Sequence, residues 1–373
     1  MMKILYDYQI FFNQPYGGIS RYFFELIKQS ERDPSVDCYV SLLFSKNQYM
    51  NTGRFRNFKS FSPRRAIQRV TSRKFRKWME KFKTLSMFRK YKCDLLHPTY
   101  YDPYILESNP PVPYVLTIHD MIHEIFSSVI SQRDQTAARK KRVAEKAQKI
   151  IAVSQCTKRD IMKYYRMEES RIEVVYHGSS FGQVRSVPLD IPFRSPDRYL
   201  LYVGSRSLYK NFHFLVEALA DLFHQEKSMH LVCAGGGDWS QEETELLTSL
   251  GIQKRVWQGD VSDSCLKWLY EHAEAFVFPS IYEGFGIPIL EAFSCGCPVI
   301  LSNRSSLPEV GGEAAQYFDP ENASSLLEAI GQVYGVPRKR DEMIEKGYNR
   351  LSHFTWEKTA RETKRVYEQV IGS

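Results

Sequence analysis

Short apolar runs alternate with helical patterns twice along this 373-residue chain, once on each side of a stretch rich in glycine and proline. Apolar runs of this length are typical of parallel strands that are buried on both faces. In the first half, strands are expected at 3–6, 38–43, 95–96, 114–118 and 150–153, with helices near 19–29, 132–148 and 156–165. In the second half, strands are expected at 199–203, 230–234, 275–278 and 299–301, with helices near 212–223, 242–250, 266–272 and 288–294. The chain is therefore predicted to be an α/β protein with two Rossmann-like, doubly wound sheets.

Residues 177–198 have the composition of a linker, because they hold two glycines and three prolines and show little periodicity. This linker predicts an N-terminal domain of residues 1–185 and a C-terminal domain of residues 186–352, followed by a helix at 353–373. In doubly wound sheets, ligands bind beyond the carboxyl ends of the strands and between domains. We therefore expect the functional residues on the loops that follow the strands.

The composition is that of a globular protein, with 43% hydrophobic and 25% charged residues. Seven scattered cysteines show no Cys-x2-Cys spacing, which predicts a reduced, cytoplasmic protein with free thiols. The first residues are too polar for a signal peptide, and no apolar run approaches the ~20 residues that span a bilayer.

Residues 279–309 are the most informative segment for function, because two carboxylates flank a Gly-Phe-Gly turn there. A proline follows the turn, in the place where helices begin, so Glu283 is expected on the loop and Glu291 about one turn inside the helix. Gly284 and Gly286 allow the backbone to approach a ligand closely, and the first N–H groups of a helix favour an anion. The arrangement suits a phosphorylated sugar, whereas the simpler interpretation is a strand, turn and helix that merely pack together.

This segment, Glu-Gly-Phe-Gly-x-Pro with a second Glu and then Pro-Val-Ile-x-Ser-Asn, resembles the donor-site signature of the retaining glycosyltransferases of family 4. The family has the GT-B fold, in which two Rossmann-like domains face a central cleft and the last helix crosses back to the first domain. The resemblance implies that Glu283 holds hydroxyls of the transferred sugar and that Glu291 holds ribose hydroxyls. It also places Phe285 and Ile287 in the donor site, beside the two glycines.

Two cations, Arg206 and Lys210, lie four positions apart on the loop that leaves the first strand of the second half. An arginine fork and a lysine point charge at this spacing can hold a diphosphate, although a pair of solvated surface bases has the same pattern. Their segment resembles the Gly-x-Arg-x-x-x-Lys-Asn donor-phosphate motif of the family. No Asp-x-Asp pair occurs in the chain, so we expect no metal and no cofactor beyond the nucleotide-sugar substrate.

Glycines near both sites suggest further contacts with the donor. Gly17 and Gly18 follow the first strand, where the family also has a Gly-Gly pair that offers main-chain N–H groups to the leaving phosphate. A tight turn would explain the same two glycines. Gly235 and Val261 lie in segments that resemble the family's contacts beneath the nucleotide and beside its base.

A histidine, His119, ends a strand of the first half and lies in the Thr-Ile-His-Asp segment. In the family, a histidine at this strand end contacts the transferred sugar or the diphosphate. A single histidine is more often structural, and His123 is a nearby competitor for the role. Asp120 is expected either to orient the imidazole or to cap the next turn.

A basic insert at residues 54–92 holds 15 Lys or Arg and one acid, Glu80, and so carries +14 against −6 for the remainder of the chain. Within it, apolar residues at helical spacing alternate with bases: Phe75, Trp78, Met79, Phe82 and Leu85 against Arg73, Lys74, Arg76, Lys77, Lys81 and Lys83. This pattern is typical of a helix that lies on an anionic membrane, and it predicts peripheral binding to the inner face of the plasma membrane through residues 63–92. Alternatively the apolar stripe packs on the first domain and the bases form a solvated rim. Nucleic acid is not favoured as a partner, because no nucleic-acid motif accompanies the charge.

The resemblance implies a metal-independent, retaining glycosyltransferase that transfers a hexosyl residue to a hydroxyl of a glycan or lipid-linked saccharide, in the synthesis of cell-surface polysaccharide. The Tyr-Gly-Gly-Ile-Ser-Arg-Tyr and Ile-His-Asp-Met segments resemble bacterial mannosyltransferases and favour GDP-mannose as the donor. A transferase of the same fold that uses a UDP-sugar, a GT-B sugar-nucleotide epimerase or hydrolase, and a non-catalytic partner subunit stay open as alternatives.

Overall fold

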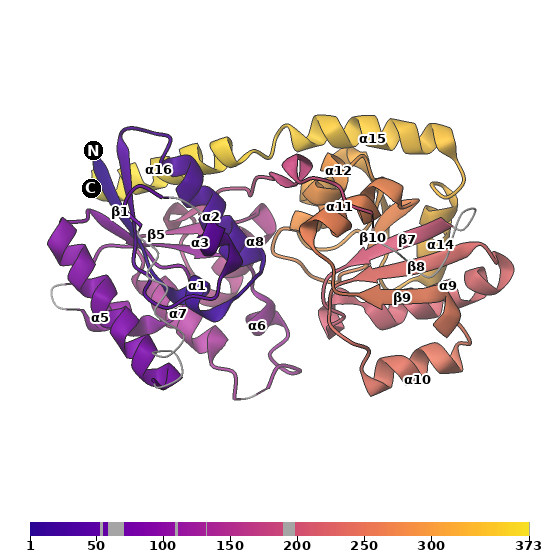
Figure 1. The fold of residues 1–373 in the computed structure, drawn as a ribbon, viewed down its shortest axis with the longest axis horizontal. Helices are drawn as coiled ribbons and strands as arrows, with labels where there is room; N and C mark the ends of the chain where they lie inside the picture. The colour runs from indigo at the N-terminus through magenta and orange to yellow at the C-terminus, as the bar shows by residue number, and fades with distance from the viewer. Residues whose placement is uncertain (53–54, 59–70, 109–110, 132, 189–197, 373) are drawn as a thin grey trace. The chain divides into compact units, whose positions relative to one another are not determined.

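The computed structural model describes residues 1–52, 55–58, 71–108, 111–131, 133–188 and 198–372 (Figure 1). Its contacts divide the chain into two compact units. Unit 1 comprises Met1–His177 with Trp356–Ser373, and unit 2 comprises Gly178–Thr355. The sequence patterns had suggested boundaries at 185/186 and 352/353. Residues 54 and 59–70 of the predicted basic insert lie outside the described residues.

The described residues of unit 1 form six parallel strands: β1 (Met2–Tyr6), β2 (Val36–Val40), β3 (Leu95–His97), β4 (Val115–Ile118), β5 (Lys149–Ala152) and β6 (Ile172–Val174). They form two three-stranded sheets with the orders β2-β1-β3 and β4-β5-β6. A parallel bridge between Leu96 and Tyr114 joins β3 to the residue before β4. All five strands predicted for the first half are present, within two or three residues of the expected ends.

The helices of unit 1 are α1 (Gln9–Asn13), α2 (Gly18–Ser30), α3 (Gln48–Thr52), α5 (Arg73–Tyr91), α6 (Ile122–Ile125), α7 (Thr136–Lys146), α8 (Gln155–Tyr165) and α16 (Trp356–Ile371), with short 3-10 turns at Pro103–Glu107 and Glu169–Arg171. The short helix α1 stands between β1 and the Gly17–Gly18 turn, where the sequence had suggested a direct connection to the first long helix. The last helix, α16, lies against α2, so both ends of the described chain belong to this unit (Figure 1).

In unit 2, the part of the chain that the structure describes forms a single six-stranded parallel sheet: β7 (Arg198–Val203), β8 (Met229–Ala234), β9 (Val256–Gly259), β10 (Ala275–Phe278), β11 (Val299–Ser302) and β12 (Ala315–Phe318). The strand order is β12-β11-β10-β7-β8-β9, so the chain moves outward in one direction from β7 and then in the other from β10. The switch point between β7 and β10 is where doubly wound sheets bind their ligands.

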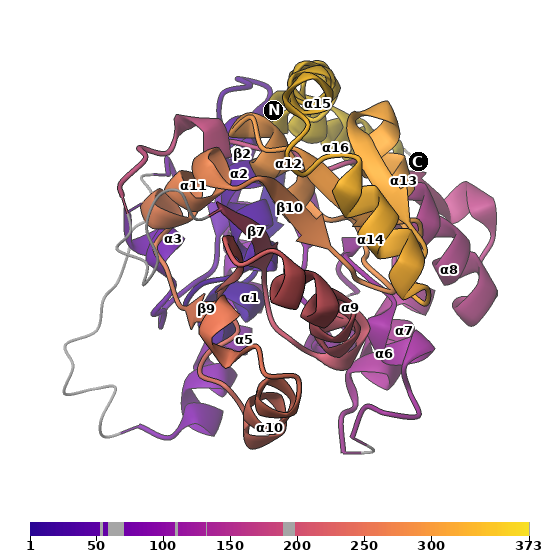
Figure 2. The ribbon, with the colours of Figure 1, turned by 90° about the vertical axis from the view of Figure 1, so that its right-hand side faces the viewer.

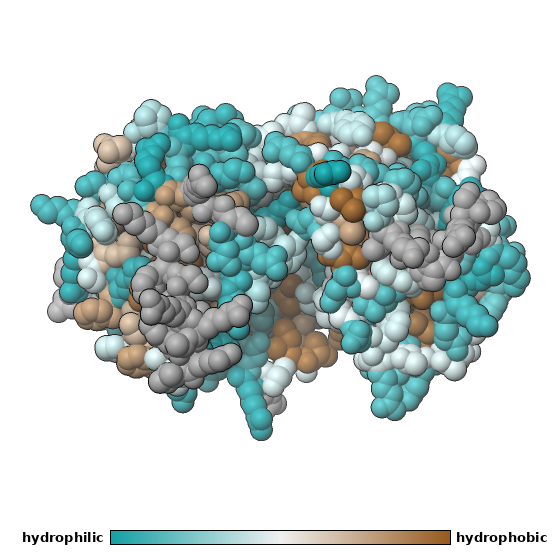
Figure 3. All heavy atoms as spheres, in the orientation of Figure 1, coloured by the Kyte–Doolittle hydropathy of each residue, from teal (hydrophilic) through white to brown (hydrophobic). Residues whose placement is uncertain are grey.

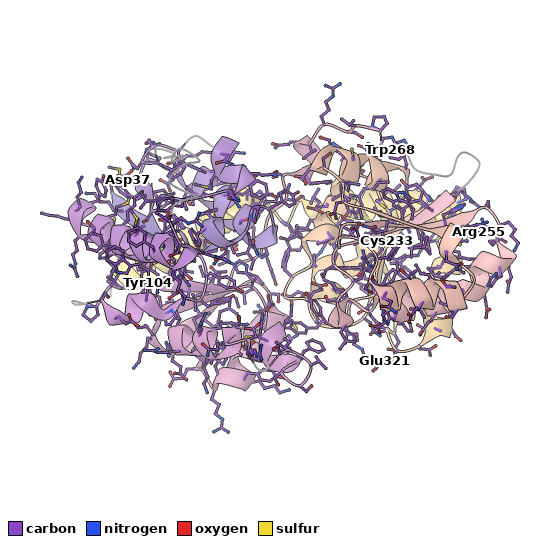
Figure 4. All side chains as sticks on the ribbon, turned by 60° about the horizontal axis from the view of Figure 1, so that its bottom comes forward. Asp37, Tyr104, Cys233, Arg255, Trp268 and Glu321 are labelled. Carbon is purple, nitrogen blue, oxygen red and sulfur yellow. The ribbon has the colours of Figure 1, made fainter. Side chains whose placement is uncertain are left out.

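Helices cover both faces of this sheet: α9 (Phe212–Gln225), α10 (Gln241–Ser249), α11 (Asp263–His272), α12 (Ile287–Ser294), α13 (Leu307–Gly311), α14 (Ala323–Gly331) and α15 (Pro337–Leu351), with 3-10 turns at Phe181–Gln183, Leu208–Lys210, Gln253–Arg255 and Gly312–Ala314. Figure 2 shows α9 and α14 on one side of the strands and α11 and α12 on the other. The core between α9, α14 and the sheet is apolar, and Cys233 on β8 lies fully buried in it (Figure 4).

The described residues on the face shown in Figure 3 are predominantly hydrophilic, with apolar residues among them. In the part of the chain that the structure describes, no helix combines the length and the apolar character that crossing a bilayer requires.

Candidate functional site

The two loops that leave the switch point of unit 2 carry an ion pair. Lys210 follows β7 and Glu283 follows β10, and Lys210 Nζ lies 2.6 Å from Glu283 Oε1. The backbone ties the same loops together, because the N–H of Ile281 donates to the carbonyl of Tyr209. Only 14% of the lysine side chain and 12% of the glutamate side chain are exposed. The structure therefore brings together two of the predicted catalytic residues at the carboxyl edge of the sheet.

Serine hydroxyls hold the loop that contains Glu283. The N–H of Glu283 donates to Ser305 Oγ at 2.9 Å, while Ser306 Oγ donates to the carbonyls of Glu283 and Phe285. Gly286 adopts a φ of 102°, and a Cβ there would lie 3.0 Å from Ile289 and 3.2 Å from Leu307 side-chain atoms. Glycine is thus required at this turn by conformation and by space. The roles of the two serines were missed in the sequence, because nothing in their spacing links them to the glutamate.

Arg206 is engaged by the glycine-rich turn after β8. Its guanidinium donates from Nε to Glu243 Oε1 at 2.7 Å, from Nη1 to the carbonyl of Gly235 at 3.1 Å, and from Nη2 to the carbonyl of Gly237 at 3.0 Å. The side chain is only 3% exposed, and its carbon Cζ lies 4.5 Å from the ring centre of Trp239. In this arrangement Arg206 organises the turn that contains Gly235.

Glu243 is the partner that the sequence analysis missed. Ser240 and Glu243 form a capping box at the start of α10, in which the Ser240 hydroxyl accepts the N–H of Glu243 and the glutamate accepts the N–H of Ser240. Burial raises the pKa of the Glu243 carboxyl, but the hydrogen bond and charge of Arg206 outweigh burial and hold it below its ordinary value. The Ser-x-x-Glu spacing was visible in the sequence and is the signal that locates this residue.

Glu291 lies in the second turn of α12 and is buried. The hydroxyl of Tyr270 donates to Glu291 Oε2 over 3.5 Å. Helix α12 begins after Gly286, which supplies no side-chain cap. In its first turn Pro288 has no N–H, and the N–H of Ile289 donates to the carbonyl of Gly286 at 3.0 Å. Val261 lies between β9 and α11 and is partly exposed, next to Asp260, whose carboxylate accepts the N–H of Gly237 at 3.4 Å.

His119 lies at the carboxyl end of β4 in unit 1, and it is buried among aromatic rings. Its ring centre is 5.0 Å from Tyr22 in an edge-on contact and 5.8 Å from His177 in a stacked one. Its Nε2 is buried and has no hydrogen-bond partner among the described residues. Burial lowers the pKa of His119 to about 3, so the ring is neutral at physiological pH.

The other predicted residues of unit 1 have local structural bonds. Asp120 Oδ1 accepts the N–H of Ile122, and Lys140 Nζ donates to the carbonyl of Asp120 at 2.8 Å, so Asp120 begins the next turn. Gly17 precedes α2, and a Cβ there would lie 2.7 Å from Gln14 Oε1. Gly18 is the first residue of α2.

A chain of buried hydroxyls and a histidine connects the last helix to β4. Tyr367 on α16 contacts Tyr6 at 3.0 Å between hydroxyls and His97 Nδ1 at 2.5 Å. The other ring nitrogen of His97 contacts Thr117 Oγ1 at 2.9 Å, two residues before His119. Burial lowers the pKa of His97 to about 3. The network fixes α16 against the strand that carries His119.

Three neutral histidines make unit 1 sensitive to acid, because burial also lowers the pKa of His177 well below its ordinary value. An unfolded histidine titrates near ~6.5, so below that pH the unfolded state binds more protons. The stability that these neutral histidines contribute is therefore fully present above pH ~6.5, and it is lost as the pH falls toward their folded-state pKa values. Replacing His177 with phenylalanine should reduce the slope of unfolding free energy against pH, by up to about 1.4 kcal/mol per pH unit, below pH ~6.

Urea denaturation at several pH values measures this slope. The matched control is His224→Phe, at an exposed position on α9, which should keep the wild-type slope. The raised pKa values of buried Asp7 and Glu80 act in the opposite direction, but they are present in every variant and cancel in the comparison. Equal slopes for wild type and His177→Phe would contradict the prediction.

Helix α5 is anchored to unit 1 through a polar face. The Glu80 carboxylate accepts the N–H groups of Leu43 and Phe44 at 2.8 and 2.6 Å, and the Thr84 hydroxyl donates to Ser41 at 2.9 Å. Lys77 and Lys81 pair with Asp102 at 2.6 and 3.2 Å. Tyr104, labelled in Figure 4, lies beside the helix with its ring centre 5.6 Å from Lys81 Nζ.

The aromatic residues of α5 face the opposite way. Phe75, Trp78 and Phe82 are 48%, 60% and 67% exposed, and consecutive rings stack with centres 5.8 and 6.1 Å apart. We call these three residues the aromatic ridge; moderately hydrophobic residues are visible among hydrophilic ones over α5 in Figure 3. The alternative in which the apolar stripe packs on the first domain is therefore wrong for this ridge, because Glu80 and Thr84 occupy the packed face.

Two family models cover most of the chain. "Glycosyltransferase Family 4" matches residues 16–180, and "Glycosyl transferases group 1" matches residues 189–350. O-antigen chain mannosyltransferase B of Escherichia coli is 30% identical over 295 residues, which are 75% of each chain. O-antigen chain mannosyltransferase RfbU of Salmonella typhimurium is 27% identical over 223 residues, 60% of this chain and 61% of the relative.

Solved structures show the same fold at low identity. Sucrose-phosphate synthase of Thermosynechococcus elongatus superposes with a TM-score of 0.73 at 20% identity, covering 100% of both chains. WaaG, a glycosyltransferase involved in lipopolysaccharide biosynthesis, gives 0.68 at 17% identity, also over 100% of both chains. The family models and the shared fold thus define a GT-B glycosyltransferase. The chain belongs to glycosyltransferase family 4, as its motifs predicted.

Proposed function

We propose that this glycosyltransferase transfers a mannosyl residue from GDP-mannose to a hydroxyl of a glycan or lipid-linked saccharide, with retention of the anomeric configuration and without a metal ion. The observation that carries the sugar assignment is the 30% identity to an O-antigen chain mannosyltransferase over three quarters of both chains. The sequence segments that resemble bacterial mannosyltransferases agree with it. Synthesis of a cell-surface polysaccharide follows as the proposed context.

The proposed chemistry places Lys210 at the leaving diphosphate, where it stabilises the negative charge that develops as the glycosidic bond breaks. Glu283 holds hydroxyls of the transferred sugar, and its ion pair with Lys210 at 2.6 Å keeps both groups at the switch point. Glu291 holds the ribose hydroxyls, and the first turn of α12 holds phosphate oxygens. No side chain is assigned as a nucleophile, so the acceptor attacks from the face of the leaving group and the leaving phosphate takes its proton.

Four residues of unit 1 are also proposed to contact the donor, because the family resemblance implies it: His119, Asp120, Gly17 and Gly18. Burial supports one part of it, since a neutral His119 with an unpartnered Nε2 can exchange a hydrogen bond with a sugar hydroxyl. Gly235, Val261, Phe285 and Ile287 are proposed contacts for the nucleotide and the sugar.

The test begins with binding. GDP at about 100 times its dissociation constant should add ~2.7 kcal/mol to the stability of unit 2. UDP and UDP-glucose are the comparison ligands, because a solved relative of the fold, HepE of Anabaena, was crystallised with UDP and glucose (TM-score 0.72, 18% identity, covering 98% of this chain and 99% of that one). Stabilisation by UDP and not by GDP would contradict GDP-mannose as the donor and favour a UDP-sugar.

Turnover then separates the remaining alternatives. With GDP-mannose and a mannan-type acceptor, product should form in the presence of EDTA, and its linkage should be α by NMR. Consumption of donor without acceptor would favour an epimerase or hydrolase instead. Recovery of activity only with added magnesium or manganese would refute the metal-independent mechanism.

We also propose that the aromatic ridge of α5 inserts into an anionic membrane surface. The ridge lies on the side of the helix away from its polar anchor. Arg73, Lys74, Arg89 and Lys90 are exposed on the same helix and complement anionic lipid. Each base near such a surface contributes about 1 kcal/mol, and each inserted aromatic side chain contributes about 1–2 kcal/mol for the part that is now exposed.

Replacing Trp78 and Phe82 with serine should therefore weaken binding to anionic vesicles by roughly 30-fold or more. Vesicle flotation at low salt measures the bound fraction. Tyr348→Ser is the matched control, because Tyr348 is 50% exposed but lies on α15 of unit 2. If the double variant binds vesicles to the same extent as wild type, the proposal that the aromatic ridge inserts into the membrane is refuted.

A further inference from the structure

A basic cavity lies on unit 1 beside the N-terminal end of α5. Its volume is about 270 Å³, and it is lined by α1, the loop after β2 and the first turn of α5. Three of its lining residues are cations, Lys46, Arg73 and Arg76, and the aromatic rings of Phe12 and Phe44 also line it. None of the described lining residues is an acid.

The positive charge of this cavity is not neutralised by nearby carboxylates. Glu80 lies one turn along α5, but its oxygens accept the N–H groups of Leu43 and Phe44. Asp102 pairs with Lys77 and Lys81. Among the described residues, neither Lys46 nor Arg76 has an acid within 4 Å, and Arg76 Nε is buried without a hydrogen-bond partner.

The cavity wall is held in place by side chains of the loop that carries Lys46. Ser45 Oγ donates to the carbonyl of Phe11 at 2.8 Å, and the Asn47 side chain donates to the carbonyl of Gln14 at 2.8 Å. Arg73 Nη2 contacts Asn13 Oδ1 at 3.3 Å, and its Cζ lies 5.9 Å from the ring centre of Phe12. Arg73 and the loop that carries Lys46 are thus held in place before any ligand arrives.

The placement of the cations is unfavourable for the helix itself. The positive end of the helix dipole lies at the first turn of α5, where Arg73, Lys74 and Arg76 add positive charge and no acid is present. Each cation placed at the positive end of the dipole costs about 0.3–1 kcal/mol. An anion bound there would interact favourably with both the dipole and the cations. The N-cap Ser72 accepts the N–H of Phe75, and other first-turn N–H groups can face an anion.

We propose that this cavity binds the phosphate or diphosphate group of a lipid-borne ligand. A volume of 270 Å³ is several times the ~30 Å³ of a water molecule, so a diphosphate and the start of its substituent fit. The aromatic ridge begins in the same turn, with Phe75 between Lys74 and Arg76, and it supplies apolar surface for the lipid part. Two carriers present this chemistry: a diphosphate-linked saccharide acceptor, which rests on the proposed function, and the head of an anionic bilayer lipid.

Inorganic pyrophosphate is the first probe, with binding measured by calorimetry on the full chain. In a Lys46→Ala/Arg76→Ala variant, affinity at this cavity should fall about tenfold or more for each charge-assisted bond lost. Lys74→Ala is the matched control: it removes one charge from the same turn, but Lys74 does not line the cavity. Since pyrophosphate can also occupy the donor site, the titrations are repeated in a Lys210→Ala background.

Two further arms identify the carrier. If the acceptor supplies the group, the double variant raises the KM for a diphosphate-linked acceptor and leaves the KM for the same saccharide without diphosphate, and for the donor, unchanged. If a bilayer lipid supplies it, flotation with phosphatidic acid vesicles falls instead. Pyrophosphate binding by the double variant equal to that of wild type overturns the proposal. That result is distinct from failure of the proposed function, which GDP binding and mannose transfer report separately.

Discussion

Replacing Lys210 with alanine should lower kcat by about 10²–10³, which is the typical loss when one group that stabilises developing negative charge is removed. The physical reason is the position of this cation. It lies at the switch point of the unit 2 sheet, held 2.6 Å from Glu283 on a loop that three serine hydrogen bonds keep in place. Steady-state kinetics with saturating donor and acceptor measure the loss.

Lys267→Ala is the control for this variant. Lys267 also has a 14% exposed side chain and pairs with an acid, Glu271 at 3.9 Å, but it lies on α11. It should keep wild-type kcat, and denaturation curves of both variants show whether unit 2 stays folded. A loss of rate in Lys210→Ala no greater than in Lys267→Ala would refute the role.

A double-mutant cycle with Glu283→Gln separates the cation's action on the leaving group from its contact with the glutamate. If Lys210 acts only by holding Glu283, the double variant should be no slower than Glu283→Gln alone. If Lys210 stabilises the diphosphate directly, its removal should slow the Glu283→Gln enzyme further. We expect the second result.

Replacing Arg206 with alanine should destabilise unit 2 by about 3–5 kcal/mol, which is typical when one partner of a buried ion pair is removed. The change leaves the Glu243 carboxylate without its partner and the carbonyls of Gly235 and Gly237 without donors. The glycine-rich turn would then lose its shape, so nucleotide affinity should fall together with stability. Chemical denaturation and calorimetric titration of the nucleotide measure the two effects.

Two companion variants test whether Arg206 acts through the turn. Arg206→Lys should recover little, because a lysine cannot reproduce the forked contacts with a carboxylate and four carbonyls. Glu243→Ala should reproduce part of the loss in nucleotide affinity from a residue on α10. Full stability of Arg206→Ala with a large fall in kcat would instead favour direct contact between the guanidinium and the leaving diphosphate.

The apolar patterns predicted the central strands well but missed two edges of the unit 2 sheet. Strands β9 and β12 lie at the ends of the order β12-β11-β10-β7-β8-β9, and each has three partly exposed residues out of four. An edge strand of this kind needs no continuous apolar run, so periodicity alone gives it no signal. The central strands, buried on both faces, have that run.

Helix α5 shows a different limit of sequence patterns. Its spacing predicted an amphipathic helix correctly, and the structure confirms the helix at Arg73–Tyr91. The pattern cannot tell which face is packed, because the anchoring acid, Glu80, forms its bonds with backbone N–H groups about forty residues earlier. Backbone N–H donors cannot be recognised from residue types, because every residue except proline has one. The same reasoning applies to Arg206, whose acidic partner lies 37 positions away.

The return of the chain to unit 1 has a consequence for biosynthesis. Helix α16 supplies buried Trp356, Val366 and Tyr367 to unit 1, yet all of unit 2 precedes it in the chain. On the ribosome, unit 2 can fold as soon as its contiguous residues emerge, whereas unit 1 lacks the buried side chains of α16 until that helix has also emerged. Unit 1 is therefore expected to mature after unit 2, and nascent-chain chaperones should bind unit 1 in the interval.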